Sequence, residues 1–431
     1  MDTHMDGAVR LRRPDRMQST LRVDCDDELI PQDHPVRIIW AVVDQLDLSA
    51  FYELIKAREG VAGRNSTDPR LLISLWLYAC TDGVGSAREL KKLCKESLPY
   101  RWLCGGIEVN HHTLSDFRVG YGAALDNLFT QVLASLVDRK LVQVNRISQD
   151  GTRVRAGAGI KSFRRRKRLE KLLEEAREHV REVRDRVNDP VGSANLSARK
   201  RAAMERAARQ RQQRVEGALA VIEQLEKRHE ETSGKAGSAD RKPPRASTTD
   251  PDARIMKTAE NGWRPAINVQ LATDTQSRAV VGVSVCSAGS DKGLAPPMRD
   301  QVEERTSGKV REHLVDGGFL VCKEIEQAHE ADVTMYVPPV APKDRSKTGT
   351  QYFPKSTDSP ALATWRIRMG SESGKKIYRQ RASTIETINA DLKTHRGLTQ
   401  LNVRGLAKVK CVVLWCALAY NLMHFGGALL S

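Results

Sequence analysis

The apolar residues of this chain change their spacing near residue 140, and this change limits the folds that the chain can adopt. Between residues 28 and 140 they recur every three or four positions, as in HPVRIIWAVVDQLDLSAFYELI, which predicts one helix after another. Asp68 predicts the capped start of one helix, and Ser86 with Glu89 predicts the capping box of another. We therefore expect an all-helical domain at residues 28–140, after a disordered tail at residues 1–27.

Strand-like patterns follow this helical stretch. LVQVNRISQDGTRVRA (141–156) begins as a strand, WRPAINVQLATDTQSRAVVGVSVC predicts a hairpin, and EHLVDGGFLV and VTMYVPP predict two more strands. Helical patterns at APPMRDQVEERTS and VCKEIEQAHE alternate with these strands. This order predicts an α/β fold with a mixed sheet and flanking helices. We expect its first part at residues 141–160, its remainder at 255–400, and an apolar C-terminal helix packed on it at 401–431.

A highly charged stretch at residues 161–232 interrupts this core. Its apolar residues recur at alternating spacings of four and three, a heptad stripe that predicts an inserted helical hairpin. It contains 20 Lys and Arg against 13 Asp and Glu, a net charge of 20 − 13 = +7, and a linker follows at 233–254. The cations at its start are candidate contacts to a DNA backbone or simply a solvated face; they are Arg164, Arg165, Arg166, Lys167 and Arg168.

The charge of the whole chain indicates a polyanionic partner. Lys and Arg exceed Asp and Glu by 70 − 54 = 16, and nucleic acid is the first partner that such a balance suggests. In a basic protein the short helices of residues 28–140 suggest a helix-turn-helix-like DNA-binding domain, with a plain helical bundle as the alternative. We expect double-stranded DNA as the partner, and neither a membrane nor a small-molecule substrate.

Cysteine and hydropathy patterns suggest a cytoplasmic protein. The eight cysteines never form a C-x-x-C pair and mostly lie in apolar runs, which favours buried thiols over a zinc site. The first twenty residues lack the apolar stretch of a signal peptide. The apolar run at residues 411–430 is interrupted by Asn421 and His424, which favours a packed helix over a membrane span.

Two aspartates followed by glycine, Asp150 and Asp316, are expected at the ends of strands, where a mixed sheet could bring them together. Carboxylates that converge at one edge of a sheet form a suitable open site for Mg²⁺ with a phosphate on it. A third acid is available from the helix KKIYRQRASTIETINADLKTH, on which Glu386 and Lys393 share a face. The alternative is that the aspartates only terminate strands at turns.

The order of these residues resembles the DDE transposases of bacterial insertion sequences. Their signature helix reads Y-x-x-R, then E, then six residues and K, and Tyr378, Arg381, Glu386 and Lys393 match it. Four residues separate Arg381 from Glu386, where the common spacing is three, and on a regular helical wheel Arg379 lies nearer to the face of Glu386. Residues 26–53 and 68–106 are similar to the helical N-terminal domain of that family.

The resemblance implies a ribonuclease-H-like catalytic core in which Asp150, Asp316 and Glu386 bind two Mg²⁺ ions, with Mn²⁺ as a possible substitute. It also implies that Tyr378, Lys393 and either Arg379 or Arg381 contact DNA near the scissile phosphate.

The expected activity is cleavage at the terminal inverted repeats of an insertion sequence and joining of the 3′-hydroxyl ends to target DNA. A dimer or higher oligomer on DNA, in the bacterial cytoplasm, is expected. The alternatives are a metal-dependent nuclease without strand transfer, and a DNA-binding regulator or silent copy.

Overall fold

Eight helices form the N-terminal part of the computed structural model, which describes residues 17, 25–58, 60, 65–189, 196–231, 243–258, 262–344, 346 and 348–431. The tail expected at residues 1–27 lies almost entirely outside the described residues. The helices are α1 (Asp26–Leu29), α2 (Pro35–Gln45), α3 (Ser49–Tyr52), α4 (Pro69–Thr81), α5 (Ala87–Glu96), α6 (Leu98–Cys104), α7 (His111–Gly120) and α8 (Gly122–Asp138).

Two predicted helix starts are confirmed by their caps. The Asp68 carboxylate accepts a hydrogen bond from the backbone N–H of Arg70 at 2.8 Å. The Ser86 hydroxyl accepts one from the N–H of Glu89 at 3.4 Å. Local side-chain chemistry therefore sets where α4 and α5 begin.

A mixed sheet follows, built from β1 (Arg146–Arg155), β4 (Arg254–Thr258), β5 (Gly262–Asp274), β6 (Val280–Cys286), β7 (Glu312–Leu314) and β8 (Thr334–Tyr336). Its order is β4-β5-β1-β7-β8, and β6 also pairs with β5. The pairs of β5 with β1, β4 and β6 are antiparallel, whereas β1/β7 and β7/β8 are parallel. The expected mixed α/β layout and the β5/β6 hairpin are confirmed.

Helices cover this sheet. They are α11 (Ala295–Thr306), α12 (Cys322–Glu330), α13 (Pro360–Gly370), α14 (Glu372–Arg381), the π-helix η5 (Ala382–Glu386), α15 (Thr387–Thr394) and α16 (Leu406–Leu430). Short 3₁₀ turns are η1 (Ile160–Ser162), η2 (Gly317–Phe319) and η4 (Thr350–Tyr352). Helices α12 and α13 pack on β8 around a hydrophobic cluster that includes Phe319, Met335 and Trp365.

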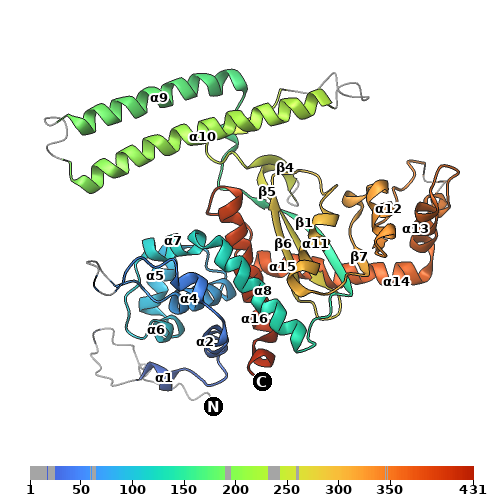
Figure 1. Ribbon diagram of the computed structural model, residues 1–431, viewed down its shortest axis with the longest axis horizontal. Coiled ribbons are helices and arrows are strands. Elements are labelled where there is room, and N and C mark those ends of the chain that lie inside the picture. Colours follow the sequence, from blue (N-terminus) through green and yellow to red (C-terminus); the bar gives the residue numbers. More distant parts are fainter. Residues whose placement is uncertain are drawn as a thin grey trace, which may run out of the picture.

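The apolar helix α16 joins the N-terminal helices to the sheet. It packs against α2, α4 and α8 on one side and β6 on the other (Figure 1). The amide of Asn421 accepts from the backbone N–H of Val280 at 2.9 Å and donates to its carbonyl oxygen at 2.8 Å. By length and hydropathy α16 could cross a membrane, but 72% of its most apolar window is buried inside the protein. One hydrophobic cluster runs from the N-terminal helices through α16 to β1, β5 and β6.

The inserted stretch forms a hairpin of α9 (Arg166–Asn188) and α10 (Ala198–Glu231), which lie side by side and extend away from the rest of the chain (Figure 1). A short pair, β2 (Phe163–Arg164) with β3 (Ala246–Ser247), closes its base, so part of the segment expected to be a linker is a strand. The hairpin has its own apolar cluster around Leu169, Val215 and Ile222.

Candidate active site

Asp150 and Asp316 occupy matching positions on two neighbouring parallel strands. In the β1/β7 pair Ser148 lies opposite Leu314, and this pairing ends there. Each aspartate follows two residues later, so both leave the paired region at the same edge. The expectation that Asp150 ends its strand is wrong, because β1 stays paired with β5 up to Arg155. Asp150 lies at a strand end only with respect to β7.

The side chain of Asp316 also shapes its own turn. Its Oδ1 accepts a hydrogen bond from the backbone N–H of Gly318 at 2.8 Å, which caps η2. A Cβ on Gly318 would lie 2.9 Å from this Oδ1, so a larger residue here would force the Asp316 carboxylate to shift. The turn explanation and the ligand explanation of the Asp-Gly-Gly sequence are therefore compatible.

Glu386 reaches the same edge from the helical segment α14–η5–α15. Residues 382–386 form a π-helical turn, which accommodates one extra residue between two α-helical segments. The expectation of a regular helix is therefore wrong here, and the extra residue between Arg381 and Glu386 is absorbed by the wider turn. As a result Arg381 faces the acids, while Arg379 is exposed.

Arg381 links two of the three acids. Its Nη2 lies 2.8 Å from Asp150 Oδ1, and its Nη1 lies 2.5 Å from Glu386 Oε1. Asn389, on α15, donates to the other oxygen of Asp150 at 3.0 Å. The side chains of Arg381 and Asp150 are 10% and 18% exposed, whereas that of Glu386 is 51% exposed. The guanidinium thus ties β1 to the π-turn.

Burial and neighbouring charges shift the pKa of Asp150 in opposite directions. Burial raises the pKa of Asp150, the Arg381 guanidinium lowers it, and the nearby Asp316 carboxylate raises it again. The net direction is upward, so the fold disfavours the charged form. Burial also raises the pKa of the Tyr378 hydroxyl, which is close enough to all three acids and to Arg381 to interact with each of them.

A buried polar layer supports this edge of the sheet, and sequence reasoning missed its central residue, Asp291. Asp291 Oδ1 accepts from Asn268 Nδ2 at 2.8 Å and from Gln270 Nε2 at 2.7 Å, and Oδ2 pairs with Arg153 Nη2 at 2.6 Å. A Cβ on Gly151 would lie 2.3 Å from Asp291 Oδ1. Asp291 is in a loop after β6, where neither periodicity nor a motif distinguishes it.

The donor set suits a divalent ion in its chemistry, but the carboxylates face Arg381. Among the described residues no group of three or more His, Cys, Asp or Glu is arranged to hold a metal ion. Carboxylate oxygens are nevertheless the ligands that Mg²⁺ prefers. Asp150 and Lys393 line one hollow of about 730 Å³ beside these acids, together with Lys257 and the exposed Trp263.

The cations at the start of the inserted hairpin lie elsewhere. Arg166 pairs with Glu226 of α10 at 2.5 Å, and Arg168 lies 3.6 Å from Glu175. Arg165, Lys167 and Arg168 are exposed and Arg164 is half-buried. Within the described residues none of these five contacts the three acids through an ion pair or hydrogen bond.

Two stretches of the chain match families of known proteins. Residues 24–120 match the model of a family described as Transposase domain (DUF772). Residues 342–425 match the model of a family described as Transposase DDE domain, and this stretch carries Tyr378, Arg381, Glu386 and Lys393. A search of curated proteins and a search of solved structures give no match.

Proposed function

Because the chain belongs to the DDE transposases of insertion sequences, we propose that it cleaves DNA at the ends of such an element and joins the 3′-hydroxyl ends to target DNA. The observation that carries this proposal is the matching register of Asp150 and Asp316 on adjacent parallel strands, with Glu386 tied to Asp150 through Arg381. The N-terminal helices would bind the terminal inverted repeats.

The strand arrangement supports a ribonuclease-H-like core. With the short strand β4 left out, the remaining five strands numbered in chain order give 3-2-1-4-5 for β6-β5-β1-β7-β8. Strand two is antiparallel to strands one and three, whereas strands four and five run parallel to strand one. Such a sheet presents acids of strands one and four at one edge.

Asp150, Asp316 and Glu386 would hold the divalent ions, Mg²⁺ with Mn²⁺ as a substitute. When bound, such ions activate an attacking oxygen and neutralise charge on the scissile phosphate. To admit them, Arg381 would release at least one carboxylate and turn its guanidinium to the phosphate, for which its planar fork is suited. Lys393 would add a second cation at the DNA backbone near the scissile phosphate, and Tyr378 would contact the DNA beside these cations.

The reaction requires no covalent intermediate with the protein. Hydrolysis of the phosphodiester at the element end leaves a free 3′-hydroxyl, and that hydroxyl then displaces a 3′-oxygen of the target strand in line. The chain's own contribution is to position the two strands and to exclude unproductive geometries. Synapsis of two ends would require at least a dimer.

The test is cleavage and joining of labelled duplexes that carry the element's own ends, in Mg²⁺ or Mn²⁺. We would compare the native chain with Asp316→Asn, since an asparagine can still accept the Gly318 hydrogen bond while it removes the charge. The matched control is Asp300→Asn, whose side chain is 72% exposed on α11. Asp316→Asn should bind the ends but neither nick nor join them, while the control does all three.

Other outcomes would support the alternative functions. Nicking without joined products would indicate a nuclease. Binding by the native chain without any cleavage would indicate a regulator or a silent copy, a possibility favoured by the ion pairs through which Arg381 engages two of the acids.

A further inference from the structure

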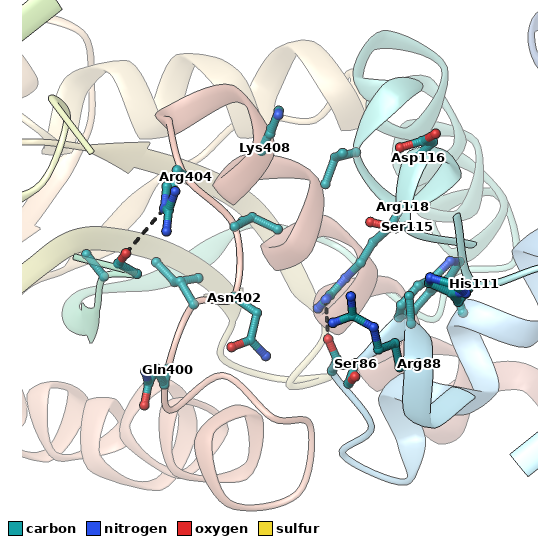
Figure 2. A pocket seen from close by; sticks show the side chains of 18 of the residues that line it. Ser86, Arg88, His111, Ser115, Asp116, Arg118, Gln400, Asn402, Arg404 and Lys408 are labelled. Atoms are coloured by element: carbon teal, nitrogen blue, oxygen red, sulfur yellow. Dashed lines mark hydrogen bonds between the residues drawn. The ribbon is translucent and has the colours of Figure 1, made fainter. Parts of the chain in front are cut away.

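A groove of about 1010 Å³ lies between the N-terminal helices and the catalytic part of the chain (Figure 2). One wall is formed by the starts of α5 and α7, and the other by residues 400–404 and 156–159. Residues 156–159 follow β1 directly, and the backbone N–H of Leu401 donates to the Arg155 carbonyl oxygen at 2.8 Å. The groove is therefore attached to the strand that bears Asp150.

Among the charged side chains that line this groove, cations outnumber carboxylates. Arg88, Arg404 and Lys408 are exposed, and Figure 2 shows Arg88 on the wall opposite Arg404. Asp116 is the one carboxylate among the lining residues that the structure describes. None of these three cations forms an ion pair with another described residue, although Arg404 donates to the Gly157 carbonyl oxygen at 3.4 Å. Burial raises the pKa of Asp250, and the charge of Arg404 opposes this rise.

Arg118, on α7, is a buried cation in the wall formed by α5 and α7. This residue is only 9% exposed. Its Nη1 donates to the Gly85 carbonyl oxygen, and its guanidinium lies 4.7 Å from the centre of the Trp76 ring. Its Nε is buried and has no hydrogen-bond partner in the part of the chain that the structure describes. Burying a charge is costly unless an opposite charge accompanies it. An anion in the groove would supply that charge.

The starts of two helices of ten residues each add to the positive potential. The first turns of α5 and α7 line the groove through Ser86, Arg88 and His111. Ser86 and Asn110 each cap one N–H group there, but both side chains are uncharged. The first-turn N–H groups of a helix carry partial positive charge and bind phosphates readily. The start of α16 does not contribute, because Asp250 and Asp252 accept hydrogen bonds from Gly405 and Leu406 there.

The positive region extends from the groove in two directions. Toward the inserted hairpin, burial lowers the pKa of Arg214 on α10, and the like charges of Arg404 and Arg211 lower it further. Toward the acids, Lys393 lines both the hollow that contains Asp150 and a second hollow that reaches Thr399. Gln400, the next residue, lines the groove itself.

We propose that this groove binds the sugar–phosphate backbone of the DNA whose end reaches the acids, with Arg88, Arg404 and Lys408 as phosphate contacts. Arg118 and the helix starts hold a phosphate at the inner wall. The inference rests on the proposed function, because it takes the bound polyanion to be the transposase's own DNA. The groove thereby orients the duplex so that its end continues along residues 393–400 to Asp150.

The experiment measures binding apart from cleavage. The full chain is titrated onto a labelled end duplex, and onto an unrelated duplex of equal length, in EDTA over a range of salt concentrations. The test protein carries Arg88→Gln, Arg404→Gln and Lys408→Gln. The control carries Lys323→Gln, Lys343→Gln and Lys355→Gln, which removes the same charge from exposed positions outside the groove. All substituted positions are exposed, so both proteins should fold.

The groove variant should bind both duplexes at least tenfold more weakly than the control. The slope of log affinity against log salt should fall by about 2 to 3, since each lost phosphate contact removes about 0.9. Equal affinities and slopes for the two variants would overturn the proposal. A loss confined to the end duplex would also overturn it, because backbone contacts do not read sequence.

The two proposals fail in different ways. If the native chain binds ends without cutting them, the proposed function fails while the groove variant still reports on the groove. If the native chain cuts and joins while the groove variant binds as the control does, the groove assignment alone fails.

Discussion

Replacing Arg381 by glutamine should destabilise the folded protein at neutral pH by about 3 kcal/mol. The largest part comes from Asp150, which loses a charged partner 2.8 Å away while remaining mostly buried. Removing one partner of a buried ion pair costs about 3–5 kcal/mol. The contact with the half-exposed Glu386 adds no more than about 1 kcal/mol. Asn389 still donates to Asp150 in the variant, so we expect a total destabilisation at the lower end of the range of about 3–5 kcal/mol.

A double-mutant cycle isolates the Arg381–Asp150 pair. Asp150→Asn alone should change stability by no more than about 1 kcal/mol, because burial already disfavours the charged form of Asp150 and Arg381 keeps Glu386. In that background Arg381→Gln should cost only about 1 kcal/mol, which gives a coupling energy of about 2 kcal/mol. The assay is urea unfolding of the four proteins without divalent metal, followed by circular dichroism.

The effect should also depend on pH with a defined sign. The folded-state pKa of Asp150 is raised, and removing Arg381 removes an interaction that lowers it, so it rises further. A group with a raised folded pKa contributes stability at low pH that is lost as pH rises through that pKa. The deficit of Arg381→Gln relative to the native chain should therefore grow from acid to neutral pH. A coupling below about 0.5 kcal/mol, or a deficit independent of pH, would refute this account.

Two further predictions concern the backbone of the site. Gly151→Ala should destabilise the protein by about 1–3 kcal/mol in urea unfolding, since its Cβ would lie 2.2 Å from Gln270 Nε2. Gly159→Ala, whose Cβ would meet nothing within 4 Å, is the control, and an equal loss in both would contradict the packing argument. Deleting Ser383 should leave the melting temperature nearly unchanged, because the π-turn at residues 382–386 then becomes α-helical and keeps its flanks aligned. Deleting the exposed Ala390 instead turns all later residues of the helix by about 100° and should lower the melting temperature markedly. Similar losses of melting temperature for both deletions would disprove the role assigned to the π-turn.

Much of the fold was predictable from interactions between residues close in sequence. The caps at Asp68 and Ser86, the β5/β6 hairpin and the helices α11 and α12 all follow from patterns a few residues long. The heptad stripe predicted the α9–α10 hairpin for the same reason, and three residues of the stripe are buried on α9: Leu169, Ala176 and Val183. Within the candidate site, the sequence indicated Asp150 and Asp316 through the glycines that follow them, and Glu386 through its helix, which resembles the transposase signature.

The sequence by itself determined the elements and the candidate acids, because periodicity and caps act within single turns or strands. Only the tertiary structure decided that Asp150 and Asp316, 166 positions apart, share one register, since this depends on how β1 and β7 pair. It also decided that Arg381 rather than Arg379 meets the acids, because packing of both flanking helices selects the π-turn. Likewise, Arg118 is buried, with no ion-pair partner among the described residues, because α7 packs against α4 and α16. Such pairings are long-range packing outcomes, which local patterns do not encode.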